Sequence, residues 1–199
     1  GRREHKGALM TIVDLPGTYS LTAYSEEELL ARNYIIGEKP DVVVDIVDSS
    51  NLERNLYLAV QLMELGVPLV LAFNMSDMAK ARGFSFDIGK LARFFDAKIV
   101  ETVGSKGQGM NELLDAVLEV AQSPEKRAAG RSPLAYGREI EEEIARVCAA
   151  LSSSGEMAGR YDARWLAVKL LEGDRDLAAM VQSAEVIRAV RNGVERIRR

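Results

Sequence analysis

The chain has 199 residues, of which 47% are hydrophobic and 28% are charged, which is typical of a globular protein with one ordinary domain and room for a small second one. No apolar run approaches the roughly 18 residues that a membrane span needs, so no direct membrane span is expected. One cysteine excludes a disulfide framework and a cysteine-based zinc site within the chain, and a net charge of −4 argues against a nucleic-acid partner.

The first 122 residues alternate between strand-like and helix-like segments. The basic segment 1–7 leads into no signal-peptide core, so export is not expected, and His5 within it is expected to be solvated. Four apolar runs predict strands over 8–14, 41–48, 67–74 and 97–103, and the second and third are typical of a parallel sheet that is buried on both faces.

Helices are predicted between these strands. Apolar residues repeat at intervals of three and four from Leu52 to Met63, and Gly66 marks the end of that helix. Segments 86–96 and 110–122 have the same character. Alternating strands and helices imply an α/β three-layer fold with right-handed crossovers.

The composition changes at residues 123–133, which hold two prolines and one glycine without an apolar period, and we predict a linker there. The predicted domains are therefore an α/β domain over 1–122 and a small all-α domain over 134–199. One apolar stripe of the second domain consists of Ile140, Ile144, Val147, Cys148 and Leu151, and its partner surface of Trp165, Leu166, Val168, Leu170 and Leu171. We expect these to pack as a compact helical unit, with Trp165 largely buried and Cys148 a small core residue rather than a reactive thiol.

Three predicted strands end in residues that suit a single ligand, because ligands of open α/β sheets bind at the carboxyl ends of the strands. These ends are Asp14-Leu15-Pro16-Gly17, Asn74-Met75-Ser76-Asp77 and Val103-Gly104-Ser105. The patterns D-x-x-G and N-x-x-D are each common alone, as a turn or a helix cap. In this order and at three strand ends, they match the guanine-nucleotide loops of the Ras-like GTPase superfamily.

The residues of each loop suit a particular part of a guanine nucleotide. The Asp77 carboxylate can accept two parallel hydrogen bonds from guanine N1 and the exocyclic amine, which adenine does not offer. Asn74 would brace the neighbouring loops, and Gly104 would present its amide to guanine O6. On the phosphate side, the Gly17 amide can approach a γ-phosphate, and Asp14 can hold Mg²⁺ through a water molecule.

Three stretches carry a family resemblance: "VDLPGTYSL" (13–21), "NLERNLYLAVQLMELGVPLVLAFNMSD" (51–77) and "RWLAVKLLEGD" (164–174). Together they resemble the cytosolic N-terminal part of the FeoB family, the bacterial ferrous iron transport protein B. The third stretch lies outside the nucleotide loops and resembles the helical domain of FeoB, which GTPases of the Era or TrmE kind do not have.

The resemblance implies a G domain over 1–122 followed by the helical domain. It implies that the intact parent binds GTP or GDP with Mg²⁺ and hydrolyses GTP, and we expect this hydrolysis to be slow because Thr18 cannot orient the attacking water. It also implies that the partner is the membrane-embedded iron-permeation domain of the same parent chain, at the cytoplasmic side of the bacterial cell membrane.

The sequence departs from the complete G-domain pattern in one respect, since G-x-x-x-x-G-K-[ST] occurs nowhere in the 199 residues. We therefore expect an incomplete Ras-like GTPase fold that lacks the phosphate loop and the first switch. The strand that precedes this loop would lie between the strands 8–14 and 41–48, leaving both with unpaired edges. The isolated chain is expected to bind nucleotide poorly and to be inactive.

No catalytic residue is assigned. Thr18 stands where Ras-like enzymes place a water-orienting glutamine and is too short for that role. Glu27 and Glu28 are weak substitutes, because Ser25 and Glu28 fit a helix capping box. Asp45, central in a predicted strand, is expected near a strand end, a partner or the exposed sheet edge.

Two alternatives stay open. One is a nucleotide-independent interaction module, which the lack of a phosphate loop favours. The other is a soluble ribosome- or tRNA-associated GTPase, against which the stretch 164–174 argues.

Overall fold

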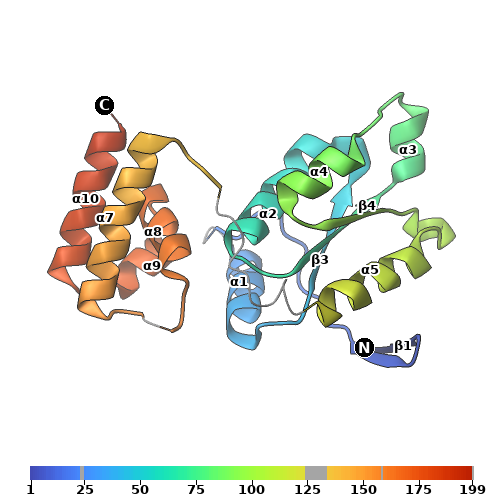
Figure 1. Cartoon of the computed structure of the whole chain (residues 1–199), viewed down its shortest axis with the longest axis horizontal. Coiled ribbons are helices and arrows are strands. Elements are labelled where there is room, and N and C mark those ends of the chain that lie inside the picture. Colours follow the sequence, from blue (N-terminus) through green and yellow to red (C-terminus); the bar gives the residue numbers. More distant parts are fainter. Residues whose placement is uncertain (23–24, 124–133, 158, 199) are drawn as a thin grey trace. The chain divides into compact units, whose positions relative to one another are not determined.

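The computed structural model describes residues 1–22, 25–123, 134–157 and 159–198. The chain divides into two compact units (Figure 1): Gly1–Leu21 with Leu30–Ser132, and Thr22–Leu29 with Pro133–Arg199. Helix α1, Glu26–Glu38, has residues in both. Most of the predicted linker, residues 124–133, lies outside the described residues.

The first unit is built on a three-stranded parallel sheet, as expected for an α/β fold. Its strands are β3 (Val43–Asp48), β4 (Leu69–Asn74) and β5 (Lys98–Glu101), in the order β3-β4-β5. The central strand β4 is buried except at Asn74, its last residue, because helices cover the sheet on both faces.

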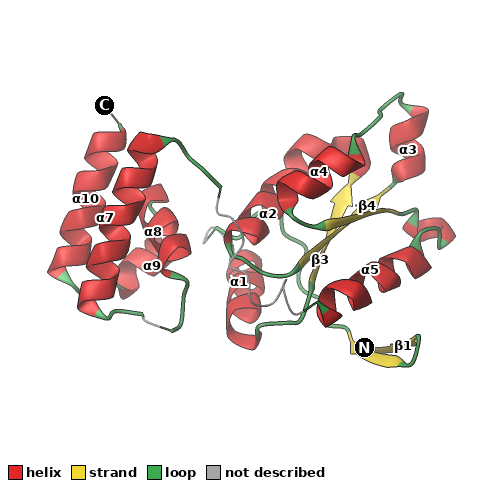
Figure 2. Ribbon diagram, in the orientation of Figure 1, coloured by secondary structure: helices red, strands yellow, loops and turns green. Residues whose placement is uncertain are grey.

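Helices cover both faces of the sheet, in the segments where an apolar period predicted them (Figure 2). They are α2 (Leu52–Glu64) and α4 (Ile88–Phe95) on one face and α5 (Met110–Gln122) on the other. On the α5 face, Val70 packs against Ala116 and Val120. The six-residue helix α3 (Ser76–Ala81) was not predicted, because it is too short to show an apolar period.

Residues 1–11 form a separate hairpin. Strand β1 (Arg2–His5) pairs antiparallel with β2 (Ala8–Thr11) through Lys6 and Gly7, which both have positive φ, as a two-residue hairpin turn requires. The predicted strand 8–14 is thus too long: it ends at Thr11, and the apolar Ile12 and Val13 lie half exposed. The two sheets are not joined in the described residues.

His5 is not solvated, contrary to the expectation. Its side chain is mostly buried, and Nε2 lies 2.6 Å from Asp115 Oδ1 on α5. Lys6 Nζ reaches the same oxygen at 2.6 Å, and the hydrogen bonds from Lys6 and His5 hold the pKa of the Asp115 carboxyl below its ordinary value. These contacts fasten the hairpin to α5.

Strand β3 stands at the edge of its sheet, and its two faces differ. Val44 and Ile46 point to the α5 face but remain 37% and 67% exposed, so the described helices cover this part of the face only incompletely. Asp45 points to the opposite face with Val47 and is buried. The expectation for Asp45 named a strand end, a partner or the exposed sheet edge, and the last of these is confirmed, because β3 is an edge strand. Asp45 Oδ2 nevertheless has no hydrogen-bond partner among the described residues.

The second unit is helical, with α7 (Arg138–Ser154), α8 (Ala163–Glu172), α9 (Arg175–Met180) and α10 (Ala184–Ile197). Side chains of Asp162, Asp174 and Ser183 cap the last three helices by accepting hydrogen bonds from backbone amides. Trp165 is 2% exposed, as predicted, and helices α7 and α8, which pack together, also bury Ile144, Val147, Leu151, Leu166 and Leu170. Cys148 is half-buried.

One ion-pair cluster lies inside this unit. The buried Glu143 of α7 accepts two hydrogen bonds from Arg196 of α10, at 2.7 and 2.8 Å, and another from Arg146. Gly193 lets α10 approach closely here, since a Cβ at this position would lie 2.8 Å from Leu171 Cδ2. Among the described residues, no helix combines the length and the apolar character that a membrane span requires.

Candidate functional site

The site begins where β4 ends. Asn74 is the last residue of the strand, and Met75 adopts a left-handed conformation, with φ of 56°, before α3 starts at Ser76. This conformation is unfavourable for a residue with a Cβ atom, and such strain is concentrated at functional turns. The turn leaves Met75 exposed, buries Ser76 and places Asp77 in the first turn of α3.

A second loop follows β5 and is bonded to the first. Asn74 Oδ1 accepts hydrogen bonds from the Gly104 amide at 2.9 Å and from the Thr102 hydroxyl at 3.4 Å. The Ser76 amide donates to the Thr102 carbonyl at 3.3 Å. The structure therefore brings Asn74, Ser76, Asp77 and the 102–106 loop together, as the positions of the strand ends led us to expect.

One detail of the expected chemistry needs correction. The Gly104 amide was expected to face guanine O6, but it already donates to Asn74 Oδ1. The next amide along the loop, that of Ser105, makes no hydrogen bond within the described part of the chain. Val103 is buried, and its backbone bonds to Gln108 instead of facing the site.

The loop after β5 keeps its shape because of a glycine. Gly109 has a φ of 77°, and a Cβ there would lie 2.3 Å from the Glu101 carbonyl oxygen. Only glycine can bring the end of the loop this close to the strand. The 3₁₀ turn Gly104–Lys106 is therefore fixed at its start by the hydrogen bond to Asn74 and after its end by the close approach of Gly109 to the strand.

Asp77 has a partner that the sequence did not predict. Lys106 Nζ donates to Asp77 Oδ2 at 2.6 Å, while Asp77 Oδ1 accepts from the Met78 amide at 2.9 Å. The hydrogen bond from Lys106 is the main reason why the pKa of the Asp77 carboxyl lies below its ordinary value. The sequence feature that could have suggested this ion pair is the lysine directly after Ser105 in the glycine-rich loop.

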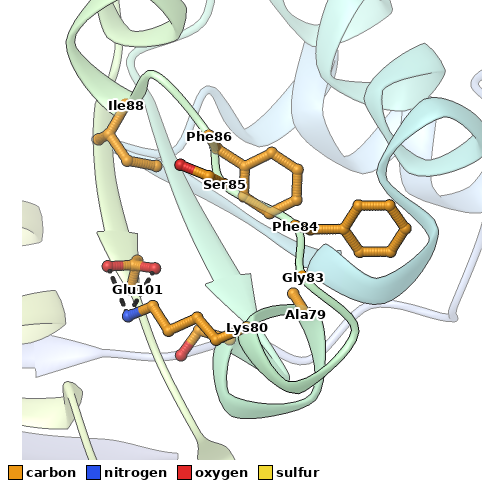
Figure 3. A pocket seen from close by; sticks show the side chains of 9 residues that line it. Ala79, Lys80, Gly83, Phe84, Ser85, Phe86, Ile88 and Glu101 are labelled. Carbon is orange, nitrogen blue, oxygen red and sulfur yellow. Dashed lines mark hydrogen bonds and ion pairs between the residues drawn. The ribbon is translucent and has the colours of Figure 1, made fainter.

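A hollow beside this site uses another side of α3. Its lining includes Ser76, Ala79 and Lys80 of α3, Phe84 and Phe86 of the following loop, and Glu101 of β5 (Figure 3). Lys80 Nζ pairs with the two Glu101 carboxylate oxygens at 3.1 and 3.2 Å. Asp77 is not part of the lining.

The loop 12–17 is not joined to these strand ends. Asp14 and Gly17 are exposed and Leu15 and Pro16 are half-buried, and no hydrogen bond or ion pair of the described residues links them to Asn74, Asp77 or the 102–106 loop. No cluster of three or more His, Cys, Asp or Glu side chains in the described ranges is arranged to hold a metal ion.

Two of the three weak catalytic candidates, Thr18 and Glu28, make local structural hydrogen bonds. The Thr18 hydroxyl donates to the Ser20 carbonyl at 2.6 Å and accepts from the Ser20 amide, so it closes a local turn. The Glu28 amide donates to Ser25 Oγ, as in a helix cap, and its carboxylate accepts from the Thr22 hydroxyl. Glu27 is exposed in the first turn of α1.

The first unit is a parallel α/β layer in which the N-x-x-D strand end is bonded to the small-residue loop after the next strand. A helical unit follows it in the chain. Together these features define a G-domain protein with an appended helical domain. Comparison with known proteins identifies the family. Residues 1–117 match the family model described as ferrous iron transport protein B, and residues 136–199 match the FeoB cytosolic helical domain. The chain belongs to the FeoB family.

The chain is 40% identical over 182 residues to the Fe(2+) transport protein A/Fe(2+) transporter FeoB fusion protein of Porphyromonas gingivalis. It is 41% identical over 186 residues to the Fe(2+) transporter FeoB of Methanocaldococcus jannaschii. These matches cover 91% and 94% of this chain but only 21% and 27% of the relatives.

Solved structures of FeoB domains are similar to between 62% and 100% of this chain. The cytosolic domain of the T. maritima FeoB iron transporter in GMPPNP form matches with a TM-score of 0.81 at 30% identity, covering 100% of this chain and 81% of that one. The FeoB G-domain from Methanococcus jannaschii matches 62% of this chain and 79% of its own, at 48% identity and a TM-score of 0.60. The mGMPPNP-bound NFeoB from S. thermophilus matches 93% of this chain and 69% of its own, at 30% identity and a TM-score of 0.77.

Proposed function

We propose that this chain is the guanine-nucleotide-binding and helical part of a ferrous iron transporter, at the cytoplasmic side of a bacterial cell membrane. The observation that carries the proposal is the bonded cluster of Asn74, Asp77 and the 102–106 loop at the strand ends. The nucleotide-bound forms of similar FeoB domains support it. The partner would be the iron-permeation domain of the same parent.

The base would be bound by the ends of β4 and β5. Asp77 would accept from guanine N1 and the exocyclic amine, and the Ser105 amide, rather than that of Gly104, would donate to O6. Asn74 would act as a positioning residue that holds both loops. Met75, exposed at the turn, would contribute apolar contact area.

The phosphate side would need more than the described loops. Asp14 would hold Mg²⁺ through water, and the Gly17 amide would approach the γ-phosphate; Mg²⁺ would supply charge neutralisation at the phosphates. We propose that a further parallel strand carrying a phosphate loop pairs with the open edge of β3. The exposed apolar side chains of Val44 and Ile46 at this edge support that pairing.

The 199-residue chain alone is therefore expected to bind GDP weakly and to hydrolyse GTP negligibly. Most of the affinity for nucleotides in such sites comes from a phosphate cradle of backbone amides and a lysine, and the sequence holds no G-x-x-x-x-G-K-[ST]. Titration of a fluorescent GDP analogue measures this. A dissociation constant at or below about 1 μM, equivalent to about 8 kcal/mol, would contradict the expectation.

The base assignment is tested by Asp77→Asn. The amide replaces one acceptor oxygen by a donor, which fits the 2-oxo group of xanthine instead of the guanine amine. The ratio of GDP to XDP affinity, measured by NMR titration, should reverse from guanine preference to xanthine preference, by about tenfold or more in each direction.

Asp14→Asn is the matched control, because it alters a carboxylate on the phosphate side and should leave this ratio unchanged. An unchanged ratio in Asp77→Asn would show that Asp77 does not read the base, and would favour a nucleotide-independent interaction module.

A further inference from the structure

Both carboxylate oxygens of the proposed base reader are already engaged. Lys106 Nζ donates to Asp77 Oδ2 at 2.6 Å, and the Met78 amide donates to Oδ1 at 2.9 Å. The Asp77 and Lys106 side chains are 38% and 58% exposed, so the pair lies at the surface, where a ligand can reach it. A guanine base that bonds to Asp77 Oδ2 therefore competes with the ammonium group for the same exposed oxygen.

The backbone directs Lys106 toward Asp77. Lys106 ends the 3₁₀ turn, and its amide donates to the Val103 carbonyl at 2.9 Å. Gly107, with a φ of 66°, turns the chain away immediately afterwards and bonds to the Gly104 carbonyl. Asn74 holds the start of the same turn, so the two loops that present Asp77 and Lys106 are fixed relative to each other.

The neighbouring lysine does not share this role. Lys80 lies one turn after Asp77 on α3 but pairs with Glu101 at the hollow beside the site (Figure 3). The two lysines are therefore paired with two different carboxylates, and only the pair of Lys106 includes the proposed base reader.

We propose that Lys106 closes the base reader while the site is empty, and that guanine enters by displacing the Lys106 ammonium from Asp77. This inference rests on the proposed function, in which Asp77 reads the base. Guanine offers two N–H donors in place of the displaced ammonium. A base without such a pair leaves the Asp77 charge poorly satisfied, so the ion pair disfavours its entry.

An exposed ion pair is worth little, so displacement is inexpensive and sensitive to salt. Guanosine is the suitable probe, because it carries no phosphate whose own salt dependence would interfere. In the unaltered chain, the affinity for guanosine measured by NMR titration should rise as salt is raised, because salt weakens the competing pair. In Lys106→Met it should be up to about fivefold higher at low salt and independent of salt.

Lys80→Met is the matched control and should keep the salt dependence of the unaltered chain. A second readout is the NMR titration of the Asp77 carboxyl, whose pKa should rise toward its ordinary value in Lys106→Met but not in Lys80→Met. An unchanged pKa in Lys106→Met would show that the pair does not form, and would overturn the inference.

Weaker guanosine binding by Lys106→Met at every salt concentration would also overturn it, because Lys106 would then support the bound base. These results are separable from failure of the proposed function. If the GDP-to-XDP ratio responds to Asp77→Asn while Lys106→Met changes nothing, only the displacement is wrong. Suppose that neither the unaltered chain nor any variant binds guanosine, and that the GDP-to-XDP ratio does not respond to Asp77→Asn. Then the displacement and the proposed function are both wrong, even if the pKa of Asp77 shows that the ion pair with Lys106 forms.

Discussion

Asp45→Asn is expected to stabilise the first unit above pH 7 by roughly 4 kcal/mol and to leave it almost unchanged near pH 4. The Asp45 side chain is buried on β3, and Oδ2 has no hydrogen-bond partner among the described residues. Desolvation by this burial raises the pKa of the carboxyl from 3.8 to about 7.

The sign follows from proton binding. Between pH 3.8 and 7 the unfolded chain has released the Asp45 proton while the folded chain still holds it. Stability therefore falls as pH rises through this range, by up to about 1.4 kcal/mol per pH unit, and is constant above it as far as this group is concerned. Asparagine does not ionise, so the variant lacks this loss.

The measurement is urea unfolding of both proteins between pH 5 and 8, with the difference in unfolding free energy plotted against pH. Asp14→Asn is the matched control, because it makes the same carboxylate-to-amide change at a side chain that is exposed in the folded chain. A difference for Asp45→Asn that does not grow with pH would mean that this carboxylate is hydrated or paired in solution.

Several elements of the fold were predictable because their apolar periods are long. Helix α5 occupies the 13 residues predicted for it, and α2 ends next to Gly66, whose φ of 73° is the left-handed conformation that ends a helix. Strand β1 was missed because Arg2–His5 is a charged segment without alternation, held by its turn and by the Asp115 contacts.

Part of the candidate site was predictable from strand ends alone. Parallel strands bring their carboxyl ends to one edge, and this places Asn74 within 2.9 Å of the Gly104 amide. The Lys106 contact was not predictable, because it depends on the exact course of a turn in which Gly107 has a positive φ. The exposure of Asp14 and Gly17 could not be foreseen either, since β2 lies in a sheet of its own.

Asp45 shows why burial is harder to predict than strand position. Its place in the middle of an apolar run was evident, but a carboxylate in such a run can face either side of the sheet. The alternation of side chains along the pleated strand determines which face Asp45 occupies. Asp45 shares a face with Val47, and the exposed side chains of Val44 and Ile46 point to the other face.

The second large effect is expected in the helical unit, where Trp165→Ala should lower the free energy of unfolding by roughly 3–5 kcal/mol. Trp165 is 2% exposed, and its ring stacks on Tyr161 with centroids 5.7 Å apart. Alanine leaves a cavity that the surrounding helices fill only in part.

The chain has one tryptophan, so its fluorescence in the unaltered protein marks the unfolding transition of this unit, and circular dichroism at 222 nm follows the same transition in the variants. Ile187→Ala on α10 is the control: Ile187 is 51% exposed, so its truncation should change stability by less than about 0.5 kcal/mol. Before any substitution, the emission of Trp165 should be shifted to shorter wavelengths than that of indole in water and be shielded from iodide. Two results together would contradict this prediction: iodide quenches Trp165 freely, and Trp165→Ala lowers the unfolding free energy no more than Ile187→Ala does. They would mean that α8 does not pack its tryptophan into the helical unit and that the stretch 164–174 presents this side chain to a partner instead.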